Sequence, residues 1–190
     1  MTDMVSLTSL WLPVLVAAIL VFIASSIVHM VLPYHRTDFG KIPSESEVMD
    51  ALRKFNIPAG DYVVPFCSKP KEMKSPEFQE KWKRGPLLMA TVWKPGPMSM
   101  GPQLVQWFIF CILVSLFAGY VASRALGPGA EYLRVSQMAS TTAFLGYAMS
   151  QWSNVIWDKR NAMTAVKSTV DGVLYGLITG GAFGWLWPTM

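Results

Sequence analysis

Long hydrophobic runs without a charged side chain divide this sequence. Asp, Glu, Lys and Arg are missing between Met4 and His35, between Pro95 and Ser123, between Val135 and Trp157, and after Asp171. Each run approaches or exceeds the about 20 residues that cross a hydrocarbon core of about 30 Å. The pattern predicts an all-α integral membrane protein, with four transmembrane helices in a bundle at residues 9–32, 102–124, 135–157 and 166–187.

The first hydrophobic run is compatible with a secretory signal or with a membrane anchor. Its leader, residues 1–7, carries Asp3 and no Lys or Arg, and the run is much longer than the about 7–15 residues of a signal core. We therefore expect an uncleaved anchor. Several tryptophans fall near the ends of the expected helices, where indoles prefer the headgroup region, and support these boundaries: Trp11, Trp107, Trp152, Trp157, Trp185 and Trp187.

A polar segment of a different pattern connects the first two expected helices, and divides the chain into residues 1–32, 33–101 and 102–190. Residues 44–55 repeat hydrophobic positions at helical spacing after a Ser-Glu-Ser-Glu sequence that resembles a capping box. Residues 61–66 and 87–93 are typical of strands, with a capped helix between them from Ser75. We expect a small α+β insert that is too small to be stable alone.

Small residues recur every fourth position in the last hydrophobic run. On a helix, such positions form one face that lets a neighbouring backbone approach closely. The second expected helix has a weaker version of this pattern. The predicted helix-packing residues are Ser168, Gly172, Gly176, Gly180 and Gly184, together with Ser115, Gly119 and Ser123. These faces can pack against one another within the four-helix bundle. Alternatively, they can bind other membrane subunits or a second copy of the chain.

The distribution of basic residues predicts an orientation. Of the 16 Lys and Arg residues, only Arg124 and Arg134 fall on the side that holds the termini and the second connection. The positive-inside rule then places both termini outside and the 33–101 insert in the cytoplasm, as in a bacterial inner-membrane protein. The chain is 52% hydrophobic and 15% charged, which also separates it from ordinary soluble domains.

Each expected helix carries a polar residue near the end that faces the basic connections. These residues predict an intramembrane polar layer of His29, Gln106, Asn154, Lys167 and Asp171. Residues 172–187 span only about 24 Å at 1.5 Å per residue, so Asp171 is drawn below the headgroups and needs a proton or a partner. Lys167 is the simplest partner, with His29 and Arg160 as rivals. The layer is either a structural clasp, which we favour, or an ion, proton or small-substrate site.

Catalytic chemistry has little support in the sequence. Two isolated cysteines, Cys67 and Cys111, do not form a zinc site, and no basic run with interleaved aromatics indicates nucleic-acid binding. A metal centre would draw on His29, His35 and Asp38, but these lack the i, i+4 ligand pair of helical metal sites, and haem is weaker still. We therefore assign no catalytic residue, metal or cofactor.

These patterns favour a non-catalytic membrane subunit, scaffold or assembly factor. The expected partners are the lipid bilayer and other membrane proteins, which would contact the small-residue helix faces. The alternative is a small transporter or proton-coupled membrane protein that uses the polar layer around Asp171. A membrane enzyme ranks third.

Overall fold

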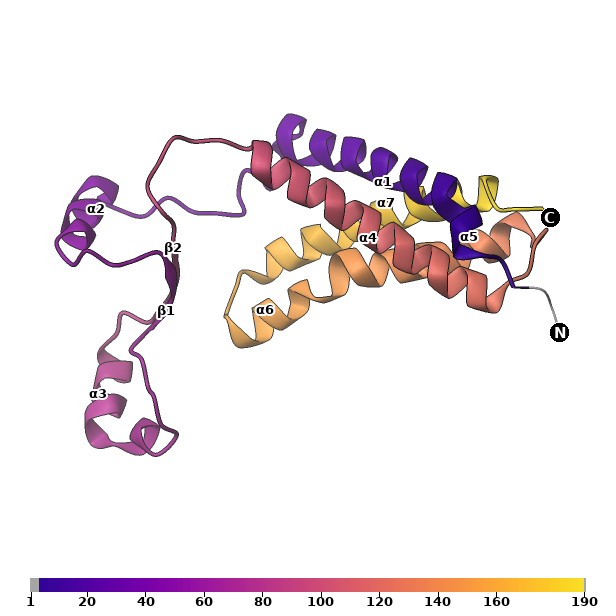
Figure 1. Cartoon of the computed structure of the whole chain (residues 1–190). Coiled ribbons are helices and arrows are strands. Elements are labelled where there is room, and N and C mark those ends of the chain that lie inside the picture. The colour runs from indigo at the N-terminus through magenta and orange to yellow at the C-terminus, as the bar shows by residue number, and fades with distance from the viewer. Residues whose placement is uncertain (1–3, 190) are drawn as a thin grey trace. The chain divides into compact units, whose positions relative to one another are not determined.

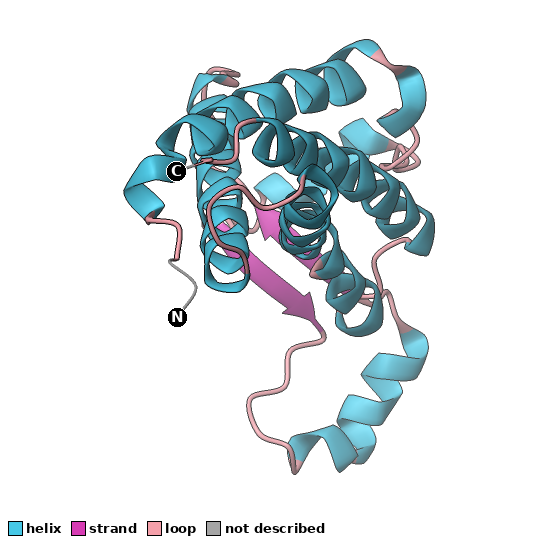
Figure 2. Ribbon diagram, turned by 90° about the vertical axis from the view of Figure 1, so that its right-hand side faces the viewer, coloured by secondary structure: helices cyan, strands magenta, loops and turns pink. Residues whose placement is uncertain are grey.

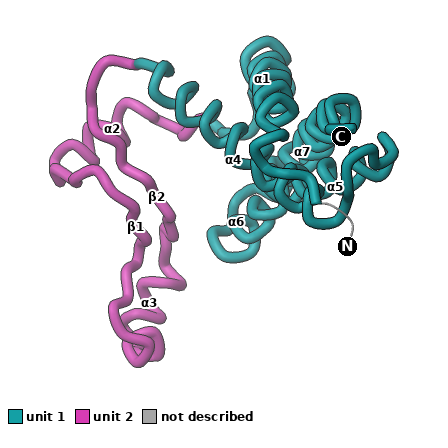
Figure 3. The backbone as a smooth tube through the Cα atoms, turned by 45° about the vertical axis from the view of Figure 1, so that its right-hand side comes forward, with its two compact units in different colours: residues 1–40, 99–190 teal, residues 41–98 magenta. Residues whose placement is uncertain are grey.

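The computed structural model describes residues 4–189, so Asp3 and the start of the N-terminal tail lie outside the described residues. The fold is mostly helical, with one two-stranded sheet. It divides into two compact units, residues 1–40 with 99–190 and residues 41–98 (Figure 3). Residues 33–40 and 99–101, at the two ends of the predicted 33–101 insert, are grouped with the helical unit.

The helical unit is built from four main helical segments (Figure 1). The first is α1 (Trp11–Ser26), which extends a 3-10 turn (Leu7–Leu10) and continues into a π-helical turn (Ile27–Val31). The second is α4 (Gly101–Ala125). A third segment joins α5 (Tyr132–Phe144), a π-helical turn (Leu145–Met149) and α6 (Gln151–Trp157), and the fourth is α7 (Ala162–Trp185). Since α1 contacts α4 and α7, and α5 contacts the same two helices, the segments close into a bundle.

Two helical stretches are long and apolar enough to cross a membrane, Leu7–Val31 and Gly101–Ala125. They coincide with the first two predicted spans. Among the described residues, the helices at the other two predicted spans are not long and apolar enough to qualify. Their composition is less apolar, because α5 and α6 carry many hydroxyl and amide side chains and α7 contains several glycines beside Lys167 and Asp171.

The glycine face of α7 is turned toward α5. A Cβ atom added at Gly176 would lie 2.9 Å from the carbonyl oxygen of Ser140, and one added at Gly180 would lie 2.5 Å from that of Ser136. Gly172 and Gly184 are similarly close to Ala148 and Tyr132. The two helices therefore approach so closely that only glycine fits between them, as in small-residue membrane packing.

The core of the bundle contains small residues around a few larger side chains. Phe183 is 0% exposed, and Leu10 and Val21 are also fully buried. The Phe183 ring lies against Gly119 of α4, where an added Cβ would come within 2.9 Å of its Cε1. Ser115 and Ser123, on the same face of α4, are buried.

The insert contains α2 (Glu45–Arg53), α3 (Pro76–Arg84) and the strands β1 (Gly60–Val64) and β2 (Leu88–Val92). Figure 2 draws the two strands in magenta. The strands pair antiparallel, with Gly60 opposite Val92 and Val64 opposite Leu88. Thr91 Oγ1 donates to Asp61 Oδ1 across them at 2.6 Å. Every residue from 41 to 98 is described, and none of them is buried.

Side-chain caps begin two of the helices. Ser75 Oγ accepts a hydrogen bond from the Phe78 amide at α3, and Asn161 Oδ1 accepts one from the Met163 amide at α7. The capping box expected at Ser44 is wrong. Ser44 precedes α2 but has a left-handed backbone, with φ of 49°, and its side chain makes no capping hydrogen bond. A box needs an extended residue at this position.

Candidate functional site

A cluster of ionisable side chains lies where the chain leaves α1 and meets the first turns of α7. The π-helical turn ends before Leu32, whose extended backbone precedes Pro33. Proline disfavours helical geometry at the preceding residue, so the chain changes direction here and forms a 3-10 turn (Pro33–His35). This turn and the following residues contact Lys167 and Asp171, which lie one helical turn apart on α7 and therefore on one face.

Lys167 holds the segment after α1 in place. Its Nζ donates hydrogen bonds to the Tyr34 carbonyl oxygen at 2.8 Å, to Thr37 Oγ1 at 2.9 Å and to Asp38 Oδ1 at 2.8 Å. The residue is 8% exposed, and its ammonium also lies 5.4 Å from the centre of the Tyr34 ring. All three donors of the ammonium are therefore used.

Asp38 joins Lys167 to His35. Its second carboxylate oxygen lies 2.6 Å from His35 Nδ1. Burial by itself raises the pKa of Asp38, but the hydrogen bonds from Lys167 and His35 and their charges outweigh burial, so the pKa lies below its usual value. Asp38 is consequently an ionised acceptor that fixes the orientation of both neighbours.

His35 connects this group to Asp171. Its Nε2 lies 2.9 Å from Asp171 Oδ2, yet this buried nitrogen lacks a well-aligned hydrogen bond to any described residue. The His35 ring also stacks on His29, with centroids 4.2 Å apart and planes 9° apart. The ligand atoms of His29, His35 and Asp171 all lie within 4.8 Å of one another.

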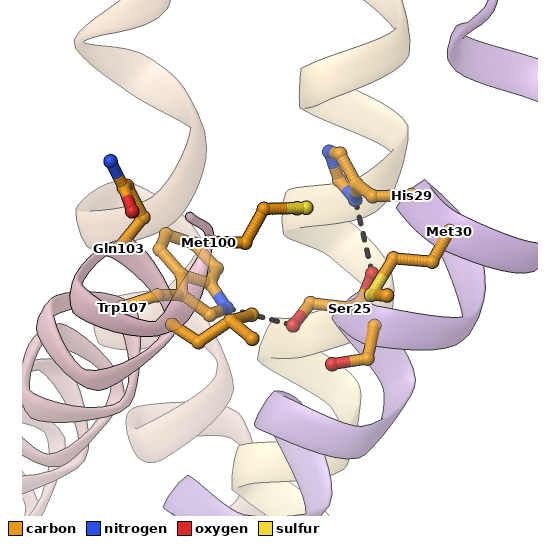
Figure 4. Close-up of a pocket in the computed structure, with 8 residues that line it drawn as sticks. Ser25, His29, Met30, Met100, Gln103 and Trp107 are labelled. Atoms are coloured by element: carbon orange, nitrogen blue, oxygen red, sulfur yellow. Dashed lines mark hydrogen bonds between the residues drawn. The ribbon is translucent and has the colours of Figure 1, made fainter. Parts of the chain in front are cut away.

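His29 belongs both to this cluster and to a neighbouring cavity of about 360 Å³ between α1 and α4. Figure 4 shows His29 Nδ1 beside the Ser25 carbonyl oxygen, at 3.1 Å, and the Trp107 indole directed at the Ser25 hydroxyl. The indole Nε1 donates to Ser25 Oγ at 2.8 Å, which connects α4 to α1. Ser25 thus uses its backbone to orient His29 and its side chain to hold α4.

The structure brings together only part of the predicted polar layer. His29, Lys167 and Asp171 lie in the cluster. Gln106 is exposed on α4, and the Asn154 amide bonds Gln151 on α6 at 3.4 Å. Within residues 4–189, no hydrogen bond or ion pair connects either amide to the cluster.

The expected partner of Asp171 is also different. Lys167 pairs with Asp38, and Asp171 pairs with His35, instead of the two pairing with each other. The physical reason is that the segment after α1 offers Lys167 three acceptors at once, which a single carboxylate on its own helix cannot do.

The sequence pattern indicated His35 and Asp38 only as weak candidate metal ligands. The usable signal was the presence of two ionisable groups, three residues apart, directly after a hydrophobic span and a proline. Two more lie four residues apart on α7. Their meeting depends on the packing of α1 against α7, which local spacing does not encode.

Comparison with protein-family models, with curated proteins and with solved structures found no significant match for this chain.

Proposed function

We propose that this protein is a four-span integral membrane subunit or scaffold that presents its insert to a partner protein. The membrane part of the proposal is supported by the surface of the two apolar stretches. Large hydrophobic side chains are exposed along them, including Ile23 and Val105. Soluble proteins rarely expose so large an apolar patch to water, whereas the hydrocarbon core of a bilayer would cover these side chains.

The segments α5 to α6 and α7 complete the proposed set of spans. The 24 residues of α7 rise about 36 Å at 1.5 Å per residue, which exceeds the about 30 Å hydrocarbon thickness. Its polar first turns contact the segment after α1, so Lys167 is ion-paired with Asp38 and Asp171 lies beside His35 wherever the boundary falls. Pairing of this kind lowers the cost of ionisable groups near a membrane.

The proposed orientation places the insert in the cytoplasm and both termini outside. To test it, single cysteines are placed at Lys71 and Glu131 in a variant without Cys67 and Cys111. Both positions are exposed. A membrane-impermeant thiol reagent on intact cells should label the cysteine at 131 and miss the one at 71. The reverse pattern would overturn the orientation.

The observation that carries the subunit role is the lack of any buried residue in 41–98. Phe66 is 73% exposed and Trp93 is 82% exposed, and both are the kind of rigid aromatic side chain that anchors protein interfaces. The small-residue faces are less suitable for a partner, because α5 already covers the glycines of α7. We therefore place the partner contact on the insert and not on the glycine face of α7.

The charge pattern of the insert favours a protein over the lipid surface. Acidic residues, including Glu45, Glu47 and Glu72, are interspersed with the basic ones along it. Anionic headgroups attract clusters of bases with few acids, which this segment does not provide.

The test places a photo-crosslinking residue at Phe66 or Trp93, with Leu177, an exposed position on α7, as the matched control. We expect a defined protein adduct from the insert positions and only lipid adducts from 177. Phe66→Ser with Trp93→Ser should then abolish co-purification of the same protein in mild detergent without lowering Tm. A chain that purifies alone and forms no adduct at 66 or 93 would refute the subunit role.

A second candidate function is favoured by the cluster at the start of α7. Titratable groups from two helices meet there, which is common on proton or ion pathways. Under this hypothesis, Asp171→Asn would stop ion or proton flux into proteoliposomes while Tm changes little. Flux that survives Asp171→Asn would exclude the transport role for this carboxylate.

A further inference from the structure

The cluster at the start of α7 contains three potential metal ligands that come from both sides of the helix contact. His29 lies in the π-helical turn after α1, His35 in the 3-10 turn and Asp171 on α7. Their ligand atoms all lie within 4.8 Å of one another. Two imidazoles and a carboxylate are a donor set that suits Zn²⁺ and related divalent transition metals.

Both imidazoles have one ring nitrogen fixed by a partner that can only accept. The Ser25 carbonyl oxygen lies 3.1 Å from His29 Nδ1, so this nitrogen carries the proton. Asp38, which also accepts from Lys167, holds the proton on His35 Nδ1 in the same way. In the neutral tautomer of each ring, the lone pair therefore lies on Nε2.

This arrangement resembles the outer shell of metal sites, where a ligating histidine donates its other N–H to a carboxylate or a backbone carbonyl. The buried His35 Nε2 has no aligned hydrogen-bond partner among the described residues, although Asp171 Oδ2 is 2.9 Å away. A lone pair and a carboxylate oxygen directed at the same small space repel each other unless a cation or a proton lies between them.

The charges of the cluster point the same way. Asp38 and Asp171 contribute two carboxylates, and Lys167 supplies one cation that is fully used by Asp38 and its neighbours. Asp171 consequently lacks a permanent positive partner among the described residues. A bound divalent cation would balance it.

We propose that His29, His35 and Asp171 bind one divalent transition-metal ion of the zinc type, with Asp38 and the Ser25 carbonyl group orienting the two imidazoles. Zinc bonds are about 2.0–2.2 Å long, so tetrahedral binding draws the donor atoms to about 3.3 Å from one another. The stacked rings must open toward the ion. His29 can move in this way because it is exposed.

Three protein ligands leave a fourth position for water or another small ligand, which is the arrangement of zinc sites that do chemistry or exchange their ligands. The proposal does not depend on the subunit role. A partner on the insert and a metal ion at α7 are tested by separate measurements.

The experiment uses the full chain in mild detergent after treatment with a chelator. Titration with Co²⁺, followed by visible absorption, should show one bound ion in a four-coordinate site, and Zn²⁺ should displace it. Zn²⁺ should also raise Tm, because a ligand that binds only the folded state stabilises it.

Two variants locate the ion. His29→Ala removes an exposed ligand and should keep the fold while weakening Co²⁺ binding at least about 10-fold and abolishing the Tm increase with Zn²⁺. Asp171→Asn should also weaken Co²⁺ binding. Cys67→Ser and Glu131→Gln remove a thiol and a carboxylate elsewhere and should change neither result.

Two results would overturn the proposal. The first is the absence of Co²⁺ and Zn²⁺ binding in the wild-type chain, which would leave the cluster with a structural role only. The second is binding that persists unchanged in His29→Ala and Asp171→Asn, which would place the ion elsewhere.

Discussion

The helical bundle and the insert differ in whether their own residues bury large hydrophobic side chains. In the bundle, Phe183 and Leu10 are completely buried among small residues. In the insert, comparable side chains such as Phe66 and Trp93 are exposed, and no residue from 41 to 98 is buried.

The difference shows what helix length and small residues contribute. Long helices with glycine on one face bring backbones close enough for a dense interior, as between α7 and α5. The insert has only short elements and a two-stranded sheet, which cannot enclose a core. The bundle therefore supplies its own packing, while the insert depends on something outside its own residues.

The largest expected effect comes from Phe183→Ala. Removing a ring from a close-packed interior forfeits its van der Waals contacts and leaves a cavity, at a cost of about 3–5 kcal/mol in the free energy of unfolding. Thermal unfolding in detergent should show a strongly lowered Tm. Phe66→Ala removes the same ring from the insert and serves as the matched control, with little change expected. Equal effects of the two substitutions would contradict the contrast.

Gly180→Leu should be the next most damaging change. The new side chain would meet the carbonyl oxygen of Ser136 on α5, which cannot rotate away, so overpacking should cost about 1–3 kcal/mol. Leu177→Ala, at a position that is 63% exposed on the same helix, should be milder. The measurement is again Tm in detergent. If both variants unfold at the wild-type temperature, α7 does not pack on α5 through this face.

A double-mutant cycle tests the ion pairs at the start of α7. Lys167→Met and Asp38→Asn should show a coupling energy of about 1–2 kcal/mol, because the Lys167 ammonium and the Asp38 carboxylate lie 2.8 Å apart and are largely shielded from water. The cycle of Lys167→Met with Asp171→Asn should give a smaller coupling, within about 0.5 kcal/mol. The opposite order of the two couplings would restore the direct Lys167–Asp171 pair that the sequence favoured.

The smallest effect is expected in the insert. Phe55→Ser and Trp93→Ser replace exposed side chains, so each should change the free energy of unfolding of the isolated protein by less than about 0.5 kcal/mol. Circular dichroism during heating is sufficient as a readout. A clear loss of stability would show that these side chains are covered within the chain itself.

The sequence alone determined the features that depend on local pattern. Charge-free runs located the main helices, of which Leu7–Val31 and Gly101–Ala125 are long and apolar enough to span a membrane. β-branched and aromatic runs bounded by Gly and Pro located both strands, and the cap at Ser75 followed by a proline located α3. A strand or a short helix can be located in this way because it is decided by neighbours along the chain. The glycine spacing on α7 likewise marked a face suited to close packing.

Only the tertiary structure decided which surfaces and charges meet. Spacing on α7 places Lys167 and Asp171 on one face, and it made them the simplest pair. The packing of α1 beside α7 brings Tyr34, Thr37 and Asp38 within reach of Lys167 and leaves Asp171 to His35. A partner distant in sequence is selected by how many donors and acceptors it satisfies at once, and that choice exists only after the helices have packed.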